Sequence, residues 1–72
     1  MKKIVGILTS TLNTDTFEYV GQMNGSAASI TKKQDNAMVF ESEREACEKI
    51  NLPQISICLI DGENVLVLRP AR

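Results

Sequence analysis

The side chains of this sequence with the most reactive chemistry are two cysteines, Cys47 and Cys58. Their spacing is not the C-x-x-C of redox and zinc motifs, and the sequence contains no histidine. Without histidine there is no Ser-His-Asp or Cys-His nucleophilic catalysis, and the commonest metal ligand is missing. We therefore predict no metal and no cofactor. The two cysteines are interpreted as small buried hydrophobic residues, with a redox couple as the alternative.

Carboxylates form two close pairs, Glu41/Glu45 and Glu45/Glu48. General acid–base catalysis needs a low-dielectric pocket that shifts a pKa, and a short exposed helix does not provide one. The polar segment 10–16 could bind an anion or a metal through its hydroxyls and Asp15, but connecting loops commonly have this composition. The glycines are isolated and form no phosphate-binding motif. The sequence therefore predicts no catalytic residue and no enzyme.

Charge is nearly balanced, with eight Lys+Arg and nine Asp+Glu and a net charge of −1. It is unevenly placed: residues 1–33 carry four lysines and two acids, and residues 34–72 carry four basic and seven acidic residues. An acidic helix surface could meet a basic protein partner. A nucleic-acid-binding module is the alternative function, and it needs four lysines gathered on one surface. The acidic contact residues are Glu41, Glu43 and Glu48, and the lysines are Lys2, Lys3, Lys32 and Lys33.

The apolar run after Lys2 and Lys3 ends at Thr9, which is too short for the hydrophobic region of a signal peptide. No stretch approaches the ~20 apolar residues of a membrane-spanning helix. We expect no membrane association and a cytoplasmic protein with reduced thiols.

The chain is short enough for one small domain, residues 1–72. Residues 2–9 predict a strand that is apolar on both faces. Residues 17–23 and 26–32 flank Asn24-Gly25 and predict a hairpin that pairs Gly21 with Ala28 and Tyr19 with Ile30. That register places five apolar side chains on one face: Phe17, Tyr19, Met23, Ala28 and Ile30.

A short helix is predicted from Ser42, because Ser42 and Glu45 form a capping box. Ala46, Cys47 and Ile50 form its apolar stripe, and Asn51 and Pro53 end it. Residues 37–40 before it could be a brief strand or a turn.

A second hairpin is predicted from residues 54–60 and 65–70 around Asp61-Gly62-Glu63-Asn64, where a two-residue Asp-Gly turn and a four-residue loop give the same facing. Ile55, Ile57 and Leu59 then share a face with Leu66 and Leu68, and we expect this face to pack on the helix. The other face receives Ser56, Cys58, Ile60, Val65, Val67 and Arg69.

These elements predict an α+β fold: an antiparallel sheet of about five strands with one short helix, in the order β-β-β-(β)-α-β-β. One short helix covers only one face of the sheet, so the other is expected to be an association surface. That surface is the candidate association face Cys58, Ile60, Val65 and Val67. It predicts a homodimer or a protein partner, formed through this face or an open edge. The alternative is a sheet that curls and covers itself like a small barrel.

The pattern Thr31…Asp35-x-Ala37-x-x-Phe40-x-Ser42-x-x-Glu45-Ala46 resembles small phage and mobile-element accessory proteins, in which a hairpin leads to A-x-x-F and then to a capped helix that begins S-x-x-E-A. The resemblance covers about residues 17–52. It implies an accessory protein that inhibits or regulates a host protein, as anti-CRISPR and other anti-defence proteins do. No catalytic or binding residue carries over, because the shared residues pack or cap.

Overall fold

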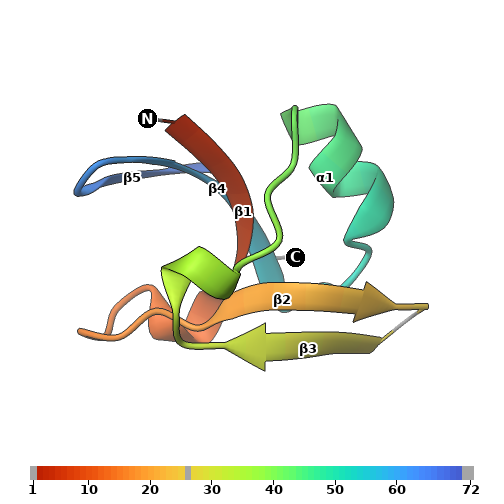
Figure 1. Ribbon diagram of the computed structural model, residues 1–72, viewed down its shortest axis with the longest axis horizontal. Helices are drawn as coiled ribbons and strands as arrows, with labels where there is room; N and C mark the ends of the chain where they lie inside the picture. The colour runs from red at the N-terminus through yellow and green to blue at the C-terminus, as the bar shows by residue number, and fades with distance from the viewer. Residues whose placement is uncertain (1, 26, 71–72) are drawn as a thin grey trace.

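The computed structural model describes residues 2–25 and 27–70. The five strands form one antiparallel sheet in the order β3-β2-β1-β4-β5, and the described residues contain one α-helix (Figure 1). The elements are β1 (Lys2–Leu8), η1 (Thr9–Thr11), β2 (Tyr19–Asn24), β3 (Ala27–Thr31), η2 (Gln34–Asn36), α1 (Glu43–Lys49), β4 (Ile55–Asp61) and β5 (Asn64–Arg69). The predicted α+β class is confirmed.

The centre of the sheet is the pair β1–β4. The two strands align in seven successive pairs, from Lys2↔Asp61 to Leu8↔Ile55. Consecutive residues of each strand are buried, including Val5 to Ile7 and Ile55 to Cys58. Side chains alternate between the faces of a strand, so such a run means that both faces of β1 and β4 are covered.

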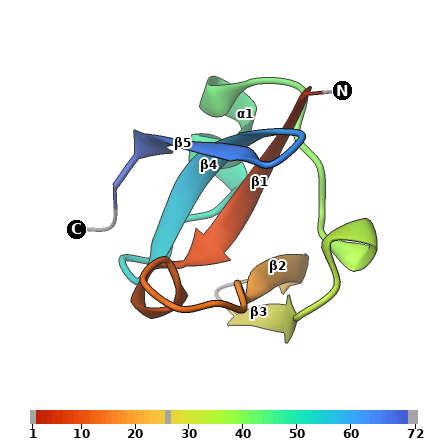
Figure 2. The ribbon, with the colours of Figure 1, turned by 90° about the vertical axis from the view of Figure 1, so that its left-hand side faces the viewer.

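The β2–β3 hairpin is joined to β1 over a much shorter length. Ile7↔Tyr19 is the registered pair, next to a bond from the Leu8 N–H to the Glu18 carbonyl at 2.8 Å. Beyond this point the hairpin runs across the end of β1 in both views (Figures 1 and 2).

Residues 37–40 form an extended link between β1 and β2. The Met38 N–H donates to the Val20 carbonyl at 2.9 Å, and the Phe40 N–H donates to the Ile4 carbonyl at 2.9 Å. Phe40 also forms an isolated antiparallel bridge with Ile4. The choice between strand and turn is thus resolved as an extended segment that hydrogen-bonds to both diverging strands.

The predicted register of the first hairpin is wrong. The observed pairs are Asn24↔Ala27, Met23↔Ala28 and Val20↔Ile30, with a bulge at Gly21. The cause is the loop, because Gly25 has the positive φ of +64° and Asn24 remains in the strand. Ser26 lies outside the described residues.

The predicted facing of the second hairpin is confirmed near its loop. Asp61 pairs with Asn64, and Gly62 takes the first loop position with φ +62°. Farther along, β5 has one more residue than β4 between paired positions, so Arg69 pairs with Ile57. The prediction that Arg69 lies on the Cys58 face is therefore wrong. The Arg69 Nη2 donates to the Ile50 carbonyl at 3.4 Å. The bulge thus directs the strand end toward the helix.

Helix α1 begins after Ser42, whose Oγ accepts from the Glu45 N–H at 3.1 Å. The Glu45 carboxylate accepts from the Glu41 N–H at 3.3 Å, one residue earlier than the predicted capping box requires. The helix lies close to β1 at Gly6, where an added Cβ would stand 2.6 Å from the Ile50 Cδ1. Glycine at this position permits the close approach of helix and sheet.

Two hydrophobic clusters lie on the two faces of the sheet. The helix-side core consists of Val20, Phe40, Ala46, Ile50, Ile55 and Ile57. The opposite core consists of Val5, Ile7, Tyr19, Ala37, Cys58 and Ile60, with Leu12, Phe17 and Val65 packed against it. The chain therefore covers both faces of its own central strands.

Candidate association surfaces

The predicted association face is largely buried within the chain. Cys58 is 0% exposed and Ile60 3% exposed, and both belong to the opposite core. Leu12, Phe17 and Tyr19 pack in the same core, because the segment between β1 and β2 and the first residue of β2 turn back over this face, whereas Met23 and Ala28 of the hairpin pack against the helix-side core. The expectation of an open second face is thus wrong for its central residues, which the chain itself covers, but the sheet of the described residues has β3 and β5 as open edges and does not close into a barrel.

Exposed apolar side chains remain on β5, at one edge of the sheet. Leu66 is 59% exposed on the helix side, opposite Leu59, and Val67 is 40% exposed on the other side, opposite Cys58. Val65, next to them, is half-buried. Two of the four predicted association residues, Val65 and Val67, lie at the surface. The other two, Cys58 and Ile60, are buried.

Leu66 was expected to pack under the helix and does not. The seven-residue helix is only ~10 Å long, and it packs over Gly6 and the helix-side core. The signal that could have identified Leu66 is its position on the last strand of the chain, since a short helix over the central strands leaves the outer strand uncovered.

The hairpin geometry determines which backbone groups of β5 are available. A two-residue loop places its closing pair, Asp61↔Asn64, in a pair that exchanges both hydrogen bonds, and such pairs then alternate along the ladder. Leu66 therefore directs its N–H and carbonyl toward β4. Val65 and Val67 direct theirs toward the open edge, where another strand can pair with them.

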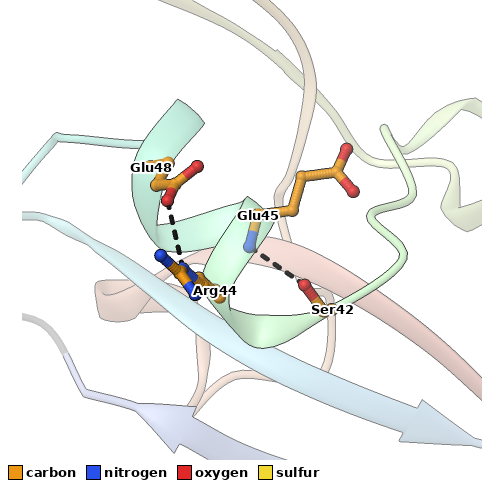
Figure 3. Close-up of polar contacts among 4 residues, drawn as sticks. All are labelled: Ser42, Arg44, Glu45 and Glu48. Atoms are coloured by element: carbon orange, nitrogen blue, oxygen red, sulfur yellow. Dashed lines mark hydrogen bonds and ion pairs between the residues drawn. The ribbon is translucent and has the colours of Figure 1, made fainter.

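The predicted acidic contact face is exposed along α1 and the residue before its cap. Glu41, Glu43 and Glu48 are all exposed. Glu48 forms an ion pair with Arg44, whose Nε lies 3.4 Å from the Glu48 Oε1 (Figure 3). Both side chains are largely in solvent, so the pair contributes little to stability, and Arg44 offsets part of the negative charge.

The four predicted nucleic-acid-contacting lysines lie in two separate places. Lys2 and Lys3 begin β1, and Lys32 and Lys33 follow β3. The start of β1 and the end of β3 lie at opposite ends of the molecule in both views (Figures 1 and 2). The structure does not bring the two pairs together.

Both cysteines are free thiols, and they differ in burial. Burial raises the pKa of the Cys58 thiol to about 11, so it is a neutral thiol at physiological pH. Its Sγ lies 3.9 Å from the Ser56 carbonyl, and Cys47 is a half-buried free thiol beside the helix-side core. Within residues 2–25 and 27–70 no group of three or more Cys, Asp or Glu side chains could hold a metal ion.

Hydroxyls of the polar segment 10–16 bond to the chain itself. The Thr11 Oγ1 donates to the Leu8 carbonyl at 2.7 Å and accepts from the Glu18 N–H at 3.1 Å. The Thr14 Oγ1 donates to the carbonyls of Thr11 and Thr16. These bonds fix the path from β1 to β2.

Two shallow hollows adjoin each other beside the end of α1. One, of about 200 Å³, is lined by Asn51, Leu52, Pro53 and Arg69. The other, of about 220 Å³, is lined by Met23, Gly25, Asn51 and Leu52. Among the described residues, neither hollow is lined by a cysteine or a carboxylate, so these residues bring together no nucleophile and general base there.

Searches against protein-family models, curated proteins and solved structures find no match. None of the helices among the described residues is long and apolar enough to cross a membrane.

Proposed function

We propose that this chain is a non-enzymatic protein that works by associating with another protein chain through the β5 edge. The supporting observation is the exposure of Leu66 and Val67 on opposite faces of an edge strand. An extended partner segment pairs with the outward N–H and carbonyl groups of Val65 and Val67. Its side chains cover Leu66 on one face and Val67 on the other.

The acidic residues Glu41, Glu43 and Glu48 contribute in a different way. They are solvent-exposed, so they attract a basic partner over a distance and raise its association rate more than they tighten the final complex. The resemblance to phage and mobile-element accessory proteins extends the proposal: the chain acts in the cytoplasm as an inhibitor or regulator of a host protein.

The experiment that tests this function is affinity capture from the native host, followed by reconstitution with the purified captured protein. Wild type is compared with Val67→Pro, which removes an outward N–H without removing a bond to β4. A third protein carries Glu41→Gln, Glu43→Gln and Glu48→Gln.

We expect Val67→Pro to abolish reconstituted binding, and the triple Gln variant to slow association and reduce its salt dependence. Circular dichroism of each variant establishes that it is folded. Unchanged binding by folded Val67→Pro would exclude the β5 edge. A complex with DNA or RNA in place of a protein would overturn the proposal.

A further inference from the structure

We propose that the occupant of the β5 edge is β5 of a second copy of this chain, antiparallel, around a two-fold axis that passes between the two Leu66 residues. The inference rests on the proposed function, because it names a second copy as the occupant of the same edge in the free protein, which a segment of the host protein replaces when it binds. The result is a continuous sheet across two copies, with an isologous interface.

The first argument for a second copy is the pattern of apolar side chains along the β5 edge. A strand that covers this edge must offer apolar side chains to both faces, since Leu66 is exposed on the helix side and Val67 on the other. β5 itself has this alternation, with Val65 and Val67 on one face and Leu66 between them. The edge is therefore complementary to itself.

Charge then fixes the direction of pairing. Glu63 lies three positions before Leu66 and Arg69 three positions after it. Antiparallel pairing centred on Leu66 brings the Glu63 end of each copy to the Arg69 end of the other, whereas parallel pairing would bring like charges together. The Arg69 Nη2 donates to the Ile50 carbonyl, which uses one of the five N–H donors of the guanidinium.

Backbone polarity finally fixes the register. Val65 and Val67 direct their hydrogen-bonding groups outward, so Val65 of one copy pairs with Val67 of the other, and Leu66 faces Leu66 in a non-hydrogen-bonded pair. At the other edge of the sheet, β3 is followed by Lys32 and Lys33, and such charges oppose pairing there. Association therefore stops at two copies.

Charged variants at the axis test this register directly. Leu66 is 59% exposed, so L66K and L66E should both fold as wild type does. Each alone places two like charges opposite each other, and we expect its dimer dissociation constant to rise about tenfold or more. Mixing L66K with L66E should restore a dimer, measured by sedimentation velocity with circular dichroism as the folding control.

Cysteine cross-linking gives a second, independent measurement. In a Cys47→Ser background, Leu66→Cys places two sulfur-bearing residues at a Cα–Cα distance of about 4.5 Å, within disulfide range. The matched control is Asn64→Cys, also exposed on β5, whose two copies stand ~13 Å apart in this register. We expect mild oxidation to cross-link the first variant and not the second.

These experiments distinguish a failure of the self-pairing from a failure of the proposed function. A wild type that is strictly monomeric at high micromolar concentration, or one that grows beyond a dimer, overturns the self-pairing. Equal cross-linking of Leu66→Cys and Asn64→Cys also overturns the self-pairing. If the chain is monomeric but Val67→Pro abolishes reconstituted binding to a different protein, the self-pairing fails and the proposed function stands. If Val67→Pro changes neither the dimerisation of the chain nor its binding to a different protein, both the self-pairing and the proposed function fail.

Discussion

The hairpins β2–β3 and β4–β5 are alike in local design. Each has a positive-φ glycine at the start of its loop and one irregularity in its ladder. They differ in how they join β1: β4 pairs with it at seven successive positions, and β2 at the single registered pair Ile7↔Tyr19. Local turn chemistry thus makes two equivalent hairpins, and the length of the contact with β1 decides which of them forms the centre of the fold.

The outer strands show the complementary difference. β3 exposes one large apolar side chain, Ile30, among small and polar residues, and it is followed by two lysines. β5 exposes Leu66 and Val67. The hairpin that is most firmly built into the core is therefore also the one whose edge is left for association. An edge strand held in place by the core suits pairing with a partner strand, because it loses little conformational entropy on binding.

Truncation of one isoleucine in each hairpin should give the largest contrast. Ile57 in β4 is fully buried, and Ile57→Ala should lower the free energy of unfolding by about 2–5 kcal/mol because it leaves a cavity. Ile30 in β3 is 40% exposed, and Ile30→Ala should cost less than about 1 kcal/mol. Urea unfolding of both variants measures the difference. Equal losses would contradict the unequal docking of the two hairpins.

Glycine replacement tests the point where both hairpins meet the helix. An added Cβ at Gly6 would stand 2.6 Å from Ile50 Cδ1, 3.0 Å from Ile55 Cγ2 and 3.1 Å from Val20 Cγ2. Gly6→Ala should therefore cost about 1–3 kcal/mol through overpacking. Gly21→Ala is the matched control, because its nearest atom would be 3.4 Å away. A thermal melt in which Gly21→Ala is the more damaging change would contradict this account.

Alkaline pH should lower the stability of the fold through the buried thiol of Cys58 in β4. Burial raises the folded pKa of Cys58 from 9.0 to about 11, so the unfolded chain loses this proton first. The contribution of this thiol to the free energy of unfolding is then constant below about pH 9 and falls as the pH rises toward 11, by up to about 2 kcal/mol. Burial of Tyr19 also raises its pKa, and this adds a loss of the same sign.

Urea midpoints measured across this pH range test the effect, with Cys58→Ala as the control. The variant should be less stable at neutral pH and should show a shallower decline above pH 9. An unchanged slope in Cys58→Ala would show that this thiol is not its source.

The smallest effects concern the helix that covers the helix-side core. Ser42→Ala removes the acceptor of the Glu45 N–H and should cost about 1 kcal/mol. Arg44→Ala breaks an exposed ion pair with Glu48 and should cost less than about 0.5 kcal/mol. Chemical denaturation of both variants checks the order, and a larger loss for Arg44→Ala would reverse it.

Local signals in the sequence determined the strands, the capped helix and the facing of Cys58, Ile60, Val65 and Val67. These features depend on residues within a few positions of one another: alternation, a cap and a glycine in a turn. The predicted loop residues Asn24 and Gly25 are wrong by one position, because a two-residue turn can hold Gly25 at either its first or its second position. The bulge that redirects Arg69 likewise has no local signature.

Tertiary structure alone decided which apolar surface stays exposed. The sequence determined that the sheet has two apolar faces and a helix that covers only one. It could not determine that Leu12, Phe17 and Tyr19 return over Cys58 and Ile60, because that contact joins segments about 40 residues apart and depends on where β2 diverges from β1. Leu66 stays exposed for a related reason: a helix of seven residues reaches Gly6 but not the edge strand.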